Sequence, residues 1–187
     1  MPPDLRVRPA VLADLPILRA LIDASVRRLQ VNDYTPAQRE GALTTVFGVD
    51  TQLIADGTYL VVEYCPPESQ AHTLIVACGG WSKRKTLYGA DQWTDRHDDL
   101  LDPRHDAAKI RAFFIHPQHA RKGVARAILQ TCEAEAKASG FQVLELMSTL
   151  PGIKLYRACG YQGDDRVELD VGPCVSIGLV PMRKELT

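Results

Sequence analysis

The segment from Lys109 to Met147 constrains the fold more than any other part of the chain. Its first part, Lys109 to Ile115, has the β-branched and aromatic character of a strand. Gly123 to Ser139 carries apolar residues at helical spacing and ends before Gly140, and Phe141 to Met147 is typical of a buried strand. A strand, a turn, a helix and a strand within about forty residues are enough for a parallel crossover. The sequence therefore predicts two parallel strands joined by a helix.

Shorter patterns on both sides of this segment predict the rest of a mixed sheet. Leu5 to Arg8 alternates apolar and charged residues and then meets Pro9, as a short strand does. Pro16 and the pair Thr35–Pro36 are typical of helix N-termini and predict two helices before the main sheet, near 13–29 and from 36 to about 48. Further strands are expected at 59–64, 73–78, 167–169 and 175–180, with Gly79-Gly80-Trp81 closing the second of these, and a short helical segment is expected at 151–159.

Length and composition favour one globular domain over residues 1–187. The chain is 45% hydrophobic and 24% charged, which is ordinary globular usage. Residues 83–106 mix charges, histidines and aromatics without a period, so we expect an inserted loop there. The net charge of −1 gives no global sign of a nucleic-acid or membrane partner. No apolar run reaches the length of a signal peptide or a membrane span, so we expect a cytoplasmic protein.

Five cysteines, widely spread and without a C-x-x-C pair, predict reduced thiols rather than a disulfide framework or a zinc site. His97 and His105 have no paired ligand spacing, and we expect no metal. The acidic residues of the insert would suit a cationic amine or a basic peptide, or they form an ordinary solvated loop; they are Asp95, Asp98, Asp99 and Asp102.

The strongest chemical signal lies where the strand Lys109 to Ile115 meets the following helix, in the run HPQHARKGVARAIL. Gly123 and Ala125 permit close backbone approach at a helix N-terminus, where unpaired N–H groups and the positive end of the dipole attract anions. Basic side chains surround them. The run contains neither a G-x-x-x-x-G-K-[ST] loop nor a G-x-G-x-x-G fingerprint. Spacing alone therefore predicts a phosphate-bearing ligand, and equally allows a plain helix start decorated by basic residues.

The order FFIHPQHARKGVARAIL, then a strand, then LYRACGY at 155–161, resembles the GNAT superfamily of acetyl-CoA-dependent N-acetyltransferases. The resemblance spans nearly the whole chain except the insert at 83–106. It implies an α/β fold with a mixed, largely antiparallel central sheet, a splayed parallel strand pair and about four flanking helices. Ala120 stands where the family usually has Gln or Arg, which removes one expected side-chain contact.

The resemblance also implies how acetyl-CoA would be bound. The pyrophosphate would be wrapped by the loop and first helical turn, made of Arg121, Lys122, Gly123, Val124, Ala125 and Arg126. The pantetheine arm would meet main-chain groups of Phe113, Phe114 and Ile115. Thr149 stands where relatives often have Asn, and it would either contact the cofactor arm or cap the segment that begins at Pro151.

Tyr156 is the expected general acid, because it falls in the block that resembles the family's Y-x-x-x-G and a phenol can protonate a leaving thiolate. The main-chain amide near Ile115 is the expected oxyanion donor. No spacing fixes the general base. Glu145, on the strand before Tyr156, is the first candidate, and a chain of waters is an alternative. The weaker candidates are Glu63, His97, Asp98, Asp99 and His105.

These features predict an N-acetyltransferase in which a primary amine attacks acetyl-CoA directly in a ternary complex. The alternative is a non-catalytic acyl-CoA-binding sensor or interaction domain, and a longer acyl donor such as succinyl- or propionyl-CoA is also open. The acceptor is either a small-molecule amine or a protein amine. A homodimer is compatible with the edge strands and the apolar segment Val175 to Val180.

Overall fold

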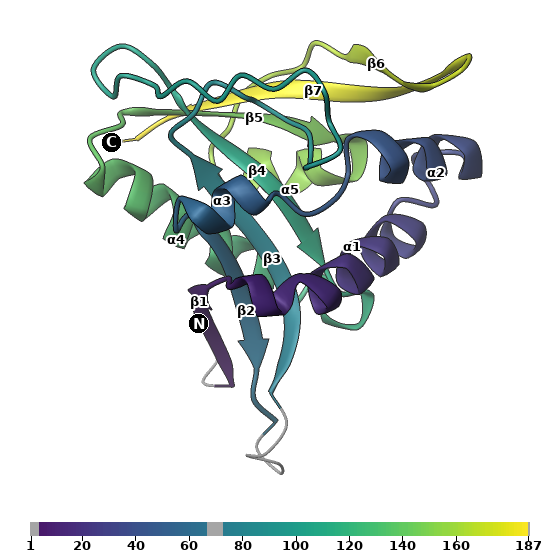
Figure 1. The fold of residues 1–187 in the computed structure, drawn as a ribbon, viewed down its shortest axis with the longest axis horizontal. Coiled ribbons are helices and arrows are strands. Elements are labelled where there is room, and N and C mark those ends of the chain that lie inside the picture. Colours follow the sequence, from purple (N-terminus) through teal and green to yellow (C-terminus); the bar gives the residue numbers. More distant parts are fainter. Residues whose placement is uncertain (1–3, 67–72, 187) are drawn as a thin grey trace.

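The fold is that of one seven-stranded mixed sheet with helices on both faces, as seen in the computed structural model, which describes residues 4–66 and 73–186 (Figure 1). The strand order is β1-β2-β3-β4-β5-β7-β6. The strands are β1 (Leu5–Pro9), β2 (Tyr59–Tyr64), β3 (Leu74–Ser82), β4 (Ala108–Ile115), β5 (Val143–Thr149), β6 (Val167–Gly172) and β7 (Val175–Glu185). The helices are α1 (Leu15–Leu29), α2 (Pro36–Thr45), α3 (Thr51–Ala55), α4 (Val124–Ala138) and α5 (Ile153–Ala158).

The parallel pair β4–β5 divides the sheet. The two strands are paired only from Ala108 to Ile110 on β4 and from Leu144 to Leu146 on β5, whereas every other neighbouring pair in the described sheet is antiparallel. Beyond Ile110, the edge of β4 that faces β5 is no longer paired with β5. The predicted mixed sheet with a splayed parallel pair is therefore confirmed.

Helices α1 and α4 cover opposite faces of the sheet (Figure 1). On α4, Ile128 and Leu129 are fully buried in a cluster that includes Val62 of β2. On α1, Leu18 lies in a second cluster that includes the neighbouring strand residue, Val61. Because successive strand residues point to opposite faces, these contacts place the two helices on the two sides of the sheet.

Two predictions about elements were wrong. A third helix, α3, precedes the main sheet; the Asp50 side chain caps it by accepting a hydrogen bond from the Gln52 N–H at 3.2 Å. The helix has only five residues, too few to show a helical period. Gly79-Gly80-Trp81 does not close β3, which continues to Ser82. Glycine is required here because a Cβ at Gly79 would lie 2.6 Å from the Phe113 ring on β4.

The insert at 83–106 is an irregular loop fixed to the rest of the molecule by hydrogen bonds. The Arg84 side chain forms an ion pair with Asp56, with Nε 2.7 Å from Oδ2. The backbone of Arg84 forms an isolated antiparallel β-bridge with Leu100 across the loop. The Thr86 hydroxyl donates to the carbonyl of His97 at 2.9 Å and accepts from its N–H at 2.8 Å. These bonds order the loop without a helix or a strand.

The apolar segment Val175 to Val180 belongs to β7, which lies between β5 and β6 inside the sheet. Ile177, Leu179 and Val180 are buried there. The apolar character of this segment is therefore explained by packing within the chain, and it gives no support to a dimer.

Candidate functional site

The loop before α4 is shaped to receive an anion. Gly123, the N-cap residue of this fifteen-residue helix, has a φ of 81°, and Arg121 has a φ of 62°. No atom lies within 4 Å of the position a Gly123 Cβ would take, so the approach to the first backbone N–H groups is open. Arg121, Lys122 and Arg126 are exposed around it. Unpaired N–H groups, the helix dipole and three cations favour a phosphate group here.

Strand β4 leads from this loop into the interior along the edge that β5 has left. A bulge displaces the register with β3, and Ala112 adopts a φ of 56° within it. The Ile115 N–H, expected to stabilise an oxyanion, donates to the Ser25 hydroxyl of α1 at 3.2 Å. The rings of Phe113 and Phe114 pack to opposite sides of the sheet, against Tyr156 and Phe47 respectively.

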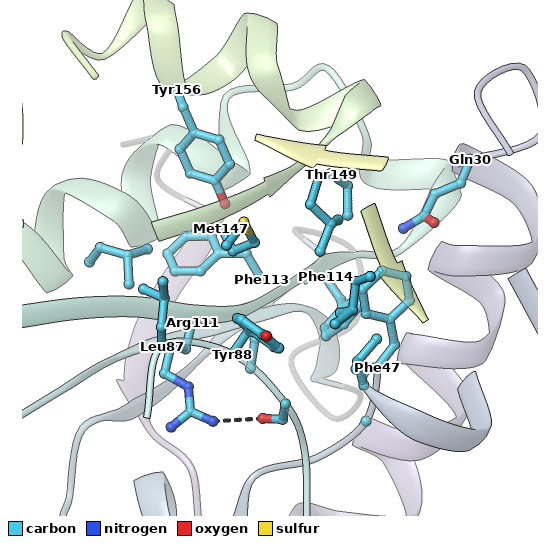
Figure 2. A pocket seen from close by; sticks show the side chains of 17 residues that line it. Gln30, Phe47, Leu87, Tyr88, Arg111, Phe113, Phe114, Met147, Thr149 and Tyr156 are labelled. Atoms are coloured by element: carbon cyan, nitrogen blue, oxygen red, sulfur yellow. Dashed lines mark hydrogen bonds between the residues drawn. The ribbon is translucent and has the colours of Figure 1, made fainter. Parts of the chain in front are cut away.

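A cavity of about 90 Å³ lies where β4 and β5 separate (Figure 2). Seventeen residues line it. They come from the C-terminal end of α1 and the turn after α2, from the insert, from β4 and β5, from α5, and from β6 and β7. These residues are Gln30, Val46, Phe47, Gly48, Leu87, Tyr88, Gly89, Ile110, Arg111, Ala112, Phe113, Phe114, Met147, Thr149, Tyr156, Leu169 and Leu179.

Tyr156 brings a hydroxyl group to this cavity. Its side chain points from α5 toward the cavity (Figure 2), and its ring packs edge-on against Phe113 and Tyr161, with centroids 6.4 and 5.7 Å away. The residue is 8% exposed. Burial, followed by the nearby Cys132 and Cys159 thiols, raises the pKa of Tyr156 above its ordinary value of 10. The phenol is therefore held in its protonated form.

Thr149 is the last residue of β5 and lines the cavity. It is the N-cap residue of the short 3-10 turn Leu150–Gly152, but its side chain forms no capping hydrogen bond. The alternative in which Thr149 caps the segment at Pro151 is therefore not supported.

Glu145, the first candidate for the base, is not among the lining residues. Its carboxylate lies 2.6 Å from Lys109 Nζ and 3.0 Å from Arg183 Nη1. The weaker candidate Glu63 is paired with Arg8 at 2.6 Å. The structure thus brings Tyr156 and Thr149 together but leaves both glutamates outside the cavity, each paired with a cation.

The carboxylates of the insert also lie outside the cavity lining. Asp98 lies 3.7 Å from Arg96, and Asp99 lies 3.3 Å from Lys85. Asp102 pairs with Arg104 at 2.7 Å, and Asp95 lies 3.6 Å from His97. Each of these four carboxylates therefore lies near a basic residue of the same loop, and the insert residues that line the cavity are Leu87, Tyr88 and Gly89.

A buried ion cluster that the sequence analysis missed holds the insert beside the cavity. Asp50, fully buried, lies 2.7 Å from Arg111 Nη2 of β4 and 3.1 Å from Arg96 Nη2 of the insert. Arg111 also donates to the carbonyl of Gly89 at 2.6 Å (Figure 2). Burial lowers the pKa of Arg111, and the facing Asp50 carboxylate acts in the opposite direction. Asp50 before Thr51 resembles a helix cap, but nothing in the sequence indicated its distant cationic partners.

Within residues 4–66 and 73–186 there is no cluster of His, Cys, Asp or Glu side chains that could hold a metal ion. All five cysteines are free thiols. None of the helices in this part of the chain is both long and apolar enough to pass through a membrane.

Comparison with known proteins gives a consistent result. Residues 50–161 match the sequence model of the acetyltransferase (GNAT) family. No curated protein sequence matches the chain. Among solved structures, a GCN5-related N-acetyltransferase from Rhodopseudomonas palustris is similar, with a TM-score of 0.67 and 19% identity over 97% of this chain and 95% of that one.

Two similar structures are described with a bound coenzyme. The protein yncA from Salmonella typhimurium, with its cofactor acetyl-CoA, has a TM-score of 0.61 and 15% identity over 98% of this chain and 95% of that one. The PaiA N-acetyltransferase from Thermoplasma acidophilum, in complex with coenzyme A, has a TM-score of 0.62 and 12% identity over 97% of this chain and 99% of that one. At these identities the similarity establishes a shared fold.

Proposed function

Since this chain belongs to the acetyltransferase (GNAT) family, we propose that it transfers the acetyl group of acetyl-CoA to the nitrogen of a primary amine, and that residues 1–187 act as one catalytic domain. The observation that carries the proposal is the continuity of the site. The open N-terminus of α4 leads along the free edge of β4 to a cavity that contains the Tyr156 hydroxyl. This arrangement separates a binding site for phosphate from a buried site for reaction.

The residues present fit acetyl-CoA. Its pyrophosphate would be held by the N–H groups at Gly123, Val124 and Ala125 and by the exposed cations beside them, because the Gly123 approach is free of other atoms. The pantetheine arm would lie along the edge of β4 from Phe113 to Ile115, where β5 no longer pairs. Acetyl-CoA supplies an activated thioester at that edge.

Two properties of the cavity support direct attack by the amine. The apolar lining disfavours an ammonium ion, so it favours the uncharged amine that can act as a nucleophile. Tyr156 keeps its proton until a thiolate forms, because burial raises its pKa. As the new N–C bond forms and the C–S bond breaks, the nitrogen loses its proton to water and Tyr156 protonates the sulfur. Solvent then returns a proton to Tyr156.

One observation favours the second candidate function, a non-catalytic acyl-CoA sensor. No carboxylate or histidine is found among the cavity-lining residues of the described chain, so a side-chain base is not provided there. Under our proposal water accepts the proton, and under the alternative no amine is acetylated.

The deciding experiment combines calorimetric binding of acetyl-CoA with a coenzyme-release assay over a panel of amines, run in parallel with propionyl- and succinyl-CoA. We expect binding and amine-dependent release, with acetyl-CoA preferred. Binding without release from any amine would favour the sensor, and preference for a longer donor would correct the acyl group. No binding would overturn both functions.

The loop assignment is tested by Gly123→Ala. The substitution places a Cβ in a left-handed conformation and in the space left for phosphate, so we expect acetyl-CoA binding to weaken about tenfold or more. Gly57→Ala is the matched control, since Gly57 also has a positive φ of 72° and open space around it but lies in the turn before β2. Both variants should lose similar stability, and equal effects on acetyl-CoA binding would contradict the assignment.

A further inference from the structure

Gln30, at the C-terminal end of α1, has a buried side-chain amide oxygen without a hydrogen-bond partner among the described residues. The residue is 6% exposed and lines the cavity. Its Oε1 is buried and forms no hydrogen bond with any described part of the chain, and its amide faces the cavity in Figure 2. A buried polar atom that lacks a partner destabilises the fold, so such atoms need an explanation. A hydrogen-bond donor on a bound molecule would give Gln30 Oε1 a partner.

The position of Gln30 relative to Tyr156 shows which group it would meet. The two side chains stand on opposite sides of the cavity in Figure 2. The reacting nitrogen must be close to the thioester and therefore on the Tyr156 side. Gln30 is thus placed to contact a second polar group of the acceptor.

The charges around the cavity restrict what this second group can be. None of the seventeen lining residues, all in the described part of the chain, is an aspartate or a glutamate. The charged side chain among them is the Arg111 guanidinium, which is bound to Asp50 and to the Gly89 carbonyl. A second ammonium group would be buried where no described lining residue supplies a carboxylate to pair with it, which is strongly unfavourable.

The remaining walls are apolar and close around a small volume. Phe47, Tyr88, Phe114 and Leu179 belong to four different segments of the chain and face the same cavity of about 90 Å³. Aromatic and aliphatic walls around so small a space suit a compact side group rather than an extended chain.

We propose, on the basis of the acetyl transfer proposed above, that the acceptor is a compact, largely apolar primary amine that carries one uncharged hydrogen-bonding group. Gln30 binds this group, a hydroxyl or an amide, and determines specificity for it. The acceptor is accordingly a small molecule and not a polyamine or a protein lysine.

The test compares two pairs of amines in the coenzyme-release assay: leucinol with isoamylamine, and phenylalaninol with phenethylamine. Within each pair the members differ by one hydroxymethyl group. Spermidine, a lysine-containing peptide and a peptide with an N-terminal alanine complete the panel. We expect the wild-type protein to favour the hydroxyl-bearing amine of each pair by about tenfold in kcat/KM.

The variant Gln30→Met replaces the amide by an apolar side chain of similar length. It should raise KM about tenfold for leucinol and phenylalaninol, leave kcat nearly unchanged, and change the values for the other two amines less than twofold. Gln130→Met on the exposed face of α4 is the matched control and should change nothing. Calorimetric binding of acetyl-CoA should be the same for the wild-type protein and both variants, and Gln30→Met should unfold at no lower temperature than the wild-type protein, because it removes the unpartnered oxygen.

Each contrary result has a distinct meaning. Equal losses of kcat/KM in Gln30→Met for both amines of a pair would show that Gln30 has a structural role, and would overturn its proposed role in specificity. A higher kcat/KM for spermidine or for either peptide than for the small amines would overturn the acceptor class and leave acetyl transfer standing. Acetyl-CoA binding without release from any amine would overturn the proposed function and this inference with it.

Discussion

At the scale of the residue, the reactivity of Tyr156 depends on its surroundings. Apolar and aromatic neighbours bury the ring and raise the pKa of the phenol, which lies at the cavity. A group of this kind does not ionise at neutral pH, so its proton is present when a thiolate forms next to it. Burial therefore keeps Tyr156 in the protonated form that the role of a general acid requires.

Tyr156→Phe removes this proton and keeps the ring. We expect kcat to fall by a factor of roughly 10²–10⁴, the usual contribution of general acid catalysis, with little change in the acetyl-CoA dissociation constant. Steady-state kinetics and calorimetry together measure both quantities. Tyr161→Phe, which alters a neighbouring buried phenol outside the cavity lining, is the control. An unchanged kcat in Tyr156→Phe would remove Tyr156 from the mechanism.

A local pattern located the turn before α4, and the family resemblance singled out Tyr156, because each motif lies within a few residues of sequence. Gln30 and Asp50 were missed for the opposite reason. Gln30 is separated from β5 by more than a hundred positions in the sequence, and Asp50 meets cations on β4 and in the insert. No local periodicity encodes such contacts. The proposed roles of Glu145, Thr149 and the cofactor residues remain predictions.

At the scale of the element, the insert depends on a single buried anion for its position. Asp50 faces both Arg96 and Arg111, and the insert supplies Leu87, Tyr88 and Gly89 to the cavity. The acidic residues that are conspicuous in its sequence are neutralised within the loop. Asp50 also caps the one-turn helix α3, which escaped prediction because a five-residue helix carries no period.

Asp50→Asn keeps a side-chain oxygen for the helix cap and removes the charge. It leaves two guanidinium groups without their buried partner, and we expect a loss of about 3–5 kcal/mol in the free energy of unfolding. Urea denaturation measures this loss. Asp102→Asn, which breaks the exposed pair with Arg104, is the control and should cost less than about 1 kcal/mol. Similar small losses in both variants would show that Asp50 does not hold the insert.

At the scale of the whole molecule, the helices and strands with a clear period could be predicted from the sequence. The positions at which they end were less predictable. Alternation and helical spacing predicted the sheet, α1 and α4, because each buries one face against the core. The continuation of β3 through Gly79 and Gly80 was not predictable, since it depends on the Phe113 ring of another strand. The place of β7 between β5 and β6 is likewise set by the assembled sheet.

As the pH falls, the free energy of unfolding should decrease in two separate pH ranges, called windows below. Desolvation, then the nearby Lys122 and His116, lower the pKa of His119 from its ordinary value of 6.5. The hydrogen bond from Arg8 lowers the pKa of Asp14 from its ordinary value of 3.8. Both groups bind fewer protons in the folded state than in the unfolded state. Stability is therefore lost as pH falls from about 6.5 through the folded pKa of His119, and again below 3.8.

His119→Gln should remove the first window and leave the second. The measurement is the free energy of unfolding from urea titrations between pH 7.5 and pH 3, with the exposed His105→Gln as control. The slope against pH between about 7 and 5 should become smaller in His119→Gln and not in the control. An unaltered slope would show that His119 is not responsible for it.

Under the proposed function, the acetyl donor and the acceptor are held by different sets of elements on the two sides of the separation of β4 from β5. Under this proposal β4 and α4 bind the coenzyme, whereas the α1–α2 region, the insert and the last two strands supply cavity walls that face the acceptor. An exchange of the insert would therefore change the cavity walls formed by Leu87, Tyr88 and Gly89, and it would have to keep the Arg96–Asp50 pair that ties the insert to Arg111 of β4.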